Sequence, residues 1–192
     1  MPAGCDGCSL CCRLLSVVEI DKPAGAWCRA VEWTRAGGRC KVHPERPDAC
    51  RTFECIWLQS QVRTPTNGFP PGQVLPPQMR PDRCGVVFAQ EAYLNGPVDP
   101  DNRKMVLFVD PNHPFAWREP GPMAQINGFL ARGGTVEVNV GSDQVTLRRG
   151  TGRVVVERSE PYYGMLRREV KFPELPGMTL DADELMRRRP GG

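Results

Sequence analysis

The chain has 192 residues and a formal net charge of +3 at pH 7, from 25 lysines and arginines against 22 aspartates and glutamates. This length accommodates one ordinary domain, or one domain with a small module. The small net charge gives no strong sign of nucleic-acid binding, and the longest apolar runs are far too short to span a bilayer. Twenty prolines and twenty glycines predict a loop-rich fold with short elements.

Eight of the nine cysteines lie within the first 55 residues, and no apolar signal sequence precedes them. We therefore expect a cytoplasmic protein, because the cytosol keeps thiols reduced and stable disulfides are rare there. An odd number of cysteines would also leave one thiol over in a scheme made only of disulfides. Residues 1–60 are interpreted as a cysteine-cluster, metal-binding module.

Within this module, Pro47 is suited to the first turn of a helix over residues 48–59. Residues 61–82 hold many prolines and glycines, which predicts an extended, linker-like segment without a regular helix or central strand. Residues 83–192 are interpreted as a small α+β region, either separate from the module or packed with it as one domain.

The pattern of apolar residues predicts several short strands and one longer helix in this region. The strands are expected at residues 85–94, 104–109, 135–140, 144–148 and 153–158. The helix is expected over residues 122–132, where apolar residues recur at spacings of three and four before Gly133-Gly134. A second short helix is predicted over 181–188. The fold class is therefore α+β: a small cysteine-rich, metal-stapled N-terminal module with short helices, packed on a small antiparallel β-sheet with one helix.

The first cysteines have the spacing of metal ligands. Cys5, Cys8 and Cys11 stand at intervals of three, which in a tight loop points three sulfurs into one cavity, as in ferredoxin and zinc-knuckle motifs. Cys12 follows Cys11 directly, and adjacent side chains diverge in most backbone conformations. One of these two is therefore expected to turn toward a second ion or into the packing.

A second group of cysteines follows between residues 28 and 55. On a regular helix Cys55 would lie about 140° around the axis from Cys50, so either the helix starts late or these two thiols serve different sites. The candidate metal ligands are Cys5, Cys8, Cys11, Cys12, Cys28, Cys40, Cys50 and Cys55. These eight cysteines are enough for two four-thiolate sites, or for one such site with the other cysteines buried as apolar side chains.

The ordered motif of the module reads Cys5-x-x-Cys8-x-x-Cys11-Cys12, then Cys28, then Cys40-x-x-His43-x-x-Arg46-Pro47-x-x-Cys50-Arg51-x-Phe53-x-Cys55. It resembles the bacterial YkgJ-type cysteine-cluster family, whose shared region is described as a zinc- or iron-chelating CxxCxxCC domain. The resemblance covers residues 5–55 and departs from the family where His43 replaces an aromatic residue, typically tyrosine. The family implies metal binding, and a related cluster in flagellin lysine methylases implies that iron–sulfur chemistry is open to it. Nothing in residues 61–192 supports a methylase assignment.

Other residues near the motif have competing interpretations. His43 follows Cys40 by three residues and is either a ligand of a mixed site or a packing residue, and we favour packing. Cys84 is expected to be a buried or free thiol rather than a ligand. Arg46 and Arg51 either offset the charge of a thiolate centre or form ordinary ion pairs.

We expect a cytosolic protein whose N-terminal cysteines chelate zinc or iron, including an iron–sulfur cluster, with a mainly structural metal. The first alternative is an iron–sulfur redox protein or enzyme component that uses the cluster catalytically, and the second is a metal buffer or metallochaperone. The metal ion is the expected partner and no membrane association is expected. The sequence leaves open whether a protein partner exists and whether the chain is an enzyme.

Overall fold

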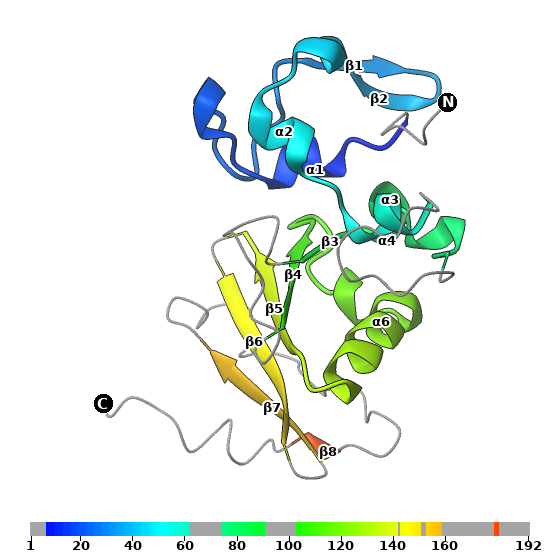
Figure 1. Ribbon diagram of the computed structural model, residues 1–192, viewed down its shortest axis with the longest axis vertical. Helices are drawn as coiled ribbons and strands as arrows, with labels where there is room; N and C mark the ends of the chain where they lie inside the picture. The colour runs from blue at the N-terminus through cyan, green and yellow to red at the C-terminus, as the bar shows by residue number, and fades with distance from the viewer. Residues whose placement is uncertain are drawn as a thin grey trace.

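The computed structural model describes residues 7–61, 74–90, 103–141, 143–150, 153–158 and 179–180. These residues form an α+β fold with a two-stranded hairpin, a six-stranded sheet and short helices. The hairpin belongs to the cysteine-rich segment, defined as residues 7–61, which lies at one end of the six-stranded sheet (Figure 1). None of the helices in these ranges has the length and apolar character needed to cross a bilayer. The helix predicted over 181–188 lies outside the described residues.

The cysteine-rich segment consists of very short elements joined by turns. In chain order they are α1 (Leu10–Leu14), the 3₁₀ helix η1 (Val18–Ile20), β1 (Val31–Thr34), β2 (Gly37–Cys40), the 3₁₀ helix η2 (His43–Glu45), α2 (Asp48–Thr52) and α3 (Ile56–Gln61). Strands β1 and β2 are antiparallel, with Val31 opposite Cys40. Pro23, Pro44 and Pro47 stand between or at the start of these elements, where a proline interrupts regular backbone hydrogen bonding.

The prediction of one continuous helix over 48–59 is wrong. Phe53, which follows α2, has φ −77° and ψ 122°, an extended conformation that ends the helix before α3 begins. The break allows Phe53 and Cys55 to pack against a small apolar cluster formed by side chains of α1 and of the sheet. Burial of these side chains, rather than helix propensity, therefore decides the course of the chain.

The six-stranded sheet places its strands in sequence order. They are β3 (Val86–Gln90), β4 (Lys104–Val109), β5 (Thr135–Val140), β6 (Asp143–Gly150), β7 (Arg153–Arg158) and β8 (Thr179–Leu180). The strands predicted at 104–109, 135–140 and 153–158 are confirmed with the same bounds. The segment preceding β3 contains the 3₁₀ helix η3 (Pro77–Met79) and α4 (Pro81–Cys84), so a short helix begins within the predicted linker.

The prediction of an antiparallel sheet is wrong, because β4 and β5 run parallel, with Lys104 opposite Thr135 and Val109 opposite Val140. The chain reaches β5 through the 3₁₀ helix η4 (Ala116–Arg118) and through α6 (Pro120–Ala131). A helical crossover returns the chain to the same end of the sheet and makes the two strands parallel. Strands β7 and β8 are also parallel, and the other neighbouring pairs are antiparallel.

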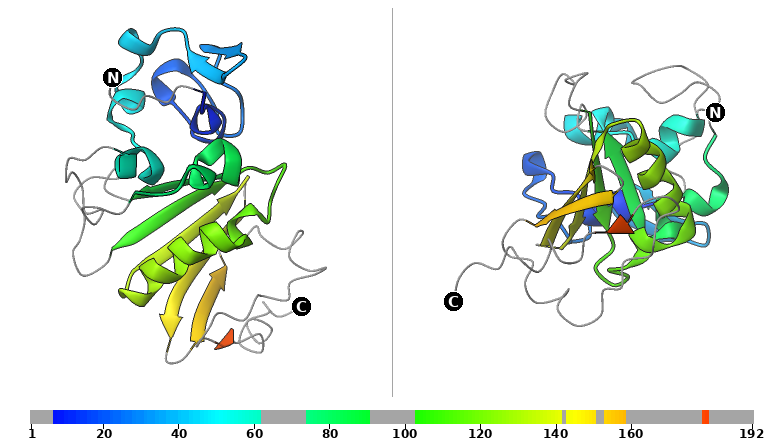
Figure 2. Two further views of the ribbon diagram at one scale, coloured as in Figure 1. Left: turned by 90° about the vertical axis from the view of Figure 1, so that its right-hand side faces the viewer. Right: turned by 90° about the horizontal axis from the view of Figure 1, so that it is seen from below.

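The main hydrophobic core lies between α6 and the face of the sheet that this helix covers (Figure 2). Val136, Val138 and Val140 alternate along β5 and are buried, and they belong to the same cluster as Ile126 and Leu130 of α6. The period of two on the strand and the spacing of four on the helix place these side chains on facing surfaces. The packed sheet is therefore a rigid support for the cysteine-rich segment at its end.

The opposite face of β4 and β5 carries interacting polar side chains. Lys104 Nζ lies 2.8 Å from Glu137 Oε2, and Asn139 Nδ2 donates to Glu137 Oε1 at 3.2 Å. Desolvation acts to raise the pKa of Glu137, but the hydrogen bonds from Lys104 and Asn139 outweigh it and hold the pKa below the ordinary value of 4.5. Glu137 is therefore a charged, paired residue of the folded state.

A largely buried ion pair joins the cysteine-rich segment to the sheet. Arg13 of α1 donates to Asp110 Oδ1 at 3.0 Å, and the two side chains are 17% and 13% exposed. Asp110 directly follows β4, and its backbone N–H donates to the carbonyl of Gly85 at 2.9 Å. The Arg13 guanidinium also lies 5.7 Å from the centre of the Trp27 ring. This contact fixes α1 against the end of β4.

Candidate metal centre

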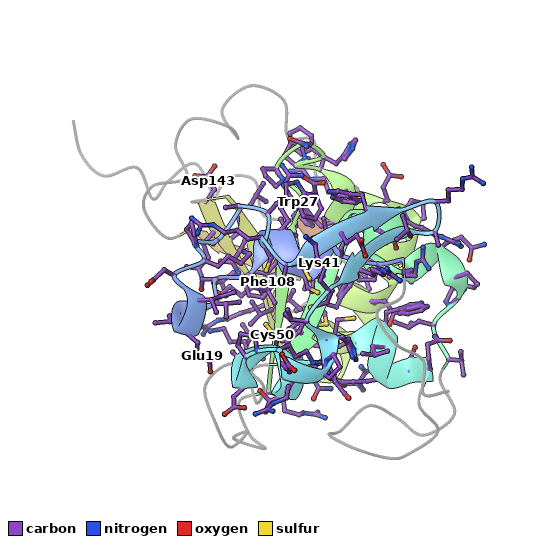
Figure 3. The ribbon with its side chains drawn as sticks, turned by 90° about the horizontal axis from the view of Figure 1, so that it is seen from above. Glu19, Trp27, Lys41, Cys50, Phe108 and Asp143 are labelled. Atoms are coloured by element: carbon purple, nitrogen blue, oxygen red, sulfur yellow. The ribbon has the colours of Figure 1, made fainter. Side chains whose placement is uncertain are left out.

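A cavity of about 1430 Å³ lies between the cysteine-rich segment and the end of the sheet. Phe108, Val109 and Asn139 line it from the sheet side. From the other side it is lined by Cys8, Cys11, Cys12, Cys28, Cys40, Cys50 and Cys55. In Figure 3, which views the molecule from this end, Cys50 and Phe108 lie near the centre of the view. Cys5, the remaining predicted ligand, lies outside the described residues.

Backbone hydrogen bonds connect the segments that carry three of these cysteines, although they are far apart in the sequence. The N–H of Cys28 donates to the carbonyl of Cys12 at 3.0 Å, and the carbonyl of Cys28 accepts from Val31 at 3.1 Å. Val31 then pairs with Cys40 across the hairpin. The hairpin therefore carries Cys40 to the position where Cys28 meets α1.

Cys12, Cys28, Cys40 and Cys50 form an electrostatic group, which we call the thiol tetrad. The pKa of Cys50 is raised, first by desolvation and then by the negative charges that the other three thiols carry when they ionise. All four of these cysteines line the same cavity, and a cation bound there would offset the repulsion between their thiolates.

The ionisation of Cys12 is already favoured in this group. A side-chain hydrogen bond from Cys11 is the largest cause, and together with the positive charges of Lys22 and Arg46 it lowers the pKa of Cys12 to about 7 against the opposing effect of burial. A thiol with this pKa is partly ionised at neutral pH, and the ionised thiolate is the form that binds metals.

Cys8, Cys11 and Cys55 lie in a more apolar setting. Burial raises the pKa of Cys8 to about 12, although the backbone N–H groups of Asp82 and Leu10 donate to its sulfur and lower it; the charges of Asp82 and Cys55 raise it further. Cys11 and Cys55 pack against the small apolar cluster that contains Leu10. Cys11 therefore lies between the two groups, because it packs against this cluster and its side chain also hydrogen-bonds to Cys12.

The donor chemistry of the tetrad fits a metal ion, whereas its side chains are not yet at bonding distances. The described cysteines are free thiols, and soft sulfur donors favour zinc and iron–sulfur clusters. Among the residues that the structure describes, no three Cys, His, Asp or Glu side chains are placed closely enough to hold an ion. Binding at the tetrad therefore requires its side chains to close in on the cavity.

The structure also locates the residues whose roles the sequence left open. His43 lines the cavity, and its Nε2 lies 3.2 Å from a guanidinium nitrogen of Arg46. Arg51 pairs with Asp48, so its charge is directed to an ordinary ion pair. Cys84 does not line the cavity, and its Sγ lies 3.4 Å from the carbonyl oxygen of Val86. Burial raises the pKa of the Cys84 thiol to about 11.

Sequence reasoning missed Lys22, which lines the cavity. Burial lowers the pKa of its ammonium group, and the ionised thiols of Cys28 and Cys12 are the strongest of the charges that oppose this effect. Its side chain is turned inward, and the residue is only 7% exposed. A single lysine in a loop carries no motif, so nothing in the sequence pattern marks it. Its position depends on the fold of the loop over residues 15–25.

Comparisons with known proteins identify no relative. No protein-family model, no curated protein and no solved structure matches the chain. The resemblance of residues 5–55 to the cysteine-cluster family therefore remains a prediction that depends on the motif itself.

Proposed function

We propose that the protein binds zinc or iron, including iron as an iron–sulfur cluster, through thiolates of its cysteine-rich segment, and that the metal is mainly structural. The observation that carries this proposal is the thiol tetrad, in which Cys12, Cys28 and Cys40 act electrostatically on Cys50 beside a common cavity. Four thiolates complete the closed shell that structural zinc requires.

A structural role is supported by the thin apolar core of this segment. Its buried apolar side chains are Cys8, Leu10, Leu14, Val17 and Ile56. Larger apolar side chains remain exposed, and Trp27 and Trp33 are 43% and 61% exposed. Hydrophobic burial alone therefore contributes little here, whereas a zinc site contributes folding free energy on the order of 10 kcal/mol.

An iron–sulfur redox protein or enzyme component is the second candidate, and the size of the cavity favours it. The cavity of about 1430 Å³ is larger than a single ion fills and larger than ordinary cofactor pockets of about 300–1,000 Å³, so it leaves room for a cluster together with a substrate or partner group. A metal buffer is distinguished from both because its fold survives removal of the metal. Chelator titration followed by circular dichroism separates that case from a structural site.

The test is metal analysis of protein purified without oxygen, together with its visible spectrum. We expect about one equivalent of metal or cluster, colourless for zinc and brown for iron–sulfur. Cys50→Ser is expected to lose most of the metal, whereas the matched control Cys84→Ser retains it, because Cys84 lies outside the cavity. Equal metal content in Cys50→Ser and wild type would remove the assignment.

A further inference from the structure

Lys22 is held in a cage of backbone carbonyls. The loop that carries it closes on itself, because the N–H of Val17 donates to the carbonyl of Lys22 at 2.9 Å and the N–H of Lys22 donates back at 3.0 Å. The ammonium group then donates to the carbonyls of Arg13 at 3.0 Å, of Leu15, and of Pro23 at 3.0 Å. An ammonium has three hydrogens to donate, and all of them are used.

This cage satisfies the hydrogen bonds of Lys22 but does not neutralise its charge. Within the described ranges, no carboxylate lies within ion-pair distance of Lys22 Nζ. The groups that would oppose its charge are instead the thiols of Cys28, Cys12, Cys11 and Cys50, which line the same cavity and act on Lys22 when they ionise, in order of decreasing effect. A charge buried to this degree is unfavourable unless an opposite charge lies nearby.

We propose that Lys22 is a positioning residue that supplies the counter-charge of the thiolate centre. This inference depends on the proposed function, because it concerns the metal-bound tetrad. When one Zn²⁺ binds the four sulfurs as thiolates, the protons that the thiols still carry are released and the bound centre has a charge of −2. The positive charge of Lys22 stabilises this product more than it stabilises the metal-free thiols, of which only a part are ionised, and it therefore raises metal affinity.

A different role for Lys22 would be structural only. Two of its acceptors, the carbonyls of Arg13 and Leu15, are the free carbonyls at the C-terminal end of α1, and a lysine that caps these groups would stabilise the segment with or without metal. The two roles differ in what they require. A counter-charge requires the positive charge, whereas a cap requires the hydrogen bonds.

The experiment compares Lys22→Gln, which keeps a hydrogen-bond donor and removes the charge, with Lys22→Arg, which keeps the charge. Lys41→Gln is the matched control, because Lys41 is an exposed lysine next to Cys40. Zinc affinity is measured by competition with a chromophoric chelator, and the metal-free proteins are compared by circular dichroism. Cobalt substitution adds a spectroscopic readout, since its sulfur-to-metal band reports the thiolate shell.

We expect Lys22→Gln to lose about 10- to 100-fold in zinc affinity, the range found when a group supporting a metal site is removed. Lys22→Arg should lose clearly less, and Lys41→Gln should match wild type. Equal losses in the Gln and Arg variants, or no loss in Lys22→Gln, would overturn the inference. If Lys22→Gln does not fold, Lys22→Arg decides: affinity close to wild type supports the counter-charge, and a loss of about tenfold or more overturns it. Absence of metal from the wild type would instead contradict the proposed function.

Discussion

Gly7→Ala tests whether the close approach between the first cysteines and the hairpin stabilises the cysteine-rich segment. Gly7 has φ +80° and forms an antiparallel bridge with Gly38. A Cβ atom at Gly7 would lie 2.3 Å from the carbonyl oxygen of Ala36, which is far inside contact distance. Because that oxygen belongs to the backbone, the hairpin that carries Cys40 would have to move away.

The chain offers a matched control for this substitution. Gly25 has φ +79°, almost the same φ angle, but a Cβ atom there meets nothing within 4 Å. Both alanine variants therefore carry the cost of a left-handed conformation, about 1–2 kcal/mol. Gly7→Ala adds the cost of overpacking, about 1–3 kcal/mol. The difference in the free energy of unfolding between the two variants therefore measures the cost of the close contact at Gly7.

The assay is urea unfolding of the metal-loaded protein, followed by intrinsic tryptophan fluorescence, with zinc affinity measured in parallel. We expect Gly7→Ala to be less stable than Gly25→Ala by about 1–3 kcal/mol, and its zinc affinity to be lower because Cys40 is displaced from the tetrad. Equal free energies of unfolding in the two variants would refute the reasoning. A lower stability with unchanged zinc affinity would show that the hairpin can move without disturbing the tetrad.

Three further predictions follow from the ionisable groups. In metal-free protein at pH 7, iodoacetamide should modify Cys12 well before Cys84, because the pKa of Cys12 is about 7 and that of Cys84 is about 11. Modification is followed by peptide mass spectrometry, and equal rates at the two cysteines would contradict this prediction. A double-mutant cycle of Arg13→Gln and Asp110→Asn should give a coupling of about 1–3 kcal/mol in the free energy of unfolding, and additivity would show that the pair is not a coupling contact. The pKa of Glu137 is lowered in the folded state. The ionised carboxylate therefore stabilises the folded state fully above pH 4.5, and this stabilisation is lost as the pH falls through the folded-state pKa. Wild type should therefore lose more stability than Glu137→Gln during acid titration, and parallel curves would contradict the pairing.

Regular periodicity made several elements of the fold predictable. The strand over residues 135–140 alternates apolar and polar side chains, and the structure buries the apolar set under α6. The helix predicted over 122–132 is found at Pro120–Ala131. These predictions succeed because the burial of one face leaves a local repeat in the sequence.

The same local patterns do not determine which strands pair or where a helix breaks. The parallel pairing of β4 and β5 follows from the crossover through α6, and the extended conformation of Phe53 follows from packing against α1 and the sheet. Both depend on contacts between distant parts of the chain. Neither leaves a repeat that can be read in a window of a few residues.

The sequence by itself determined that the first 55 residues concentrate the thiols and that elements there are short. It left open how those thiols divide. The tertiary structure placed seven of those thiols around one cavity, with Cys8 and Cys55 toward its apolar side and Cys11 in a hydrogen bond with Cys12. It also placed Lys22 in the lining of the same cavity. The physical reason is that electrostatic interaction depends on distance in space, which only the folded chain defines.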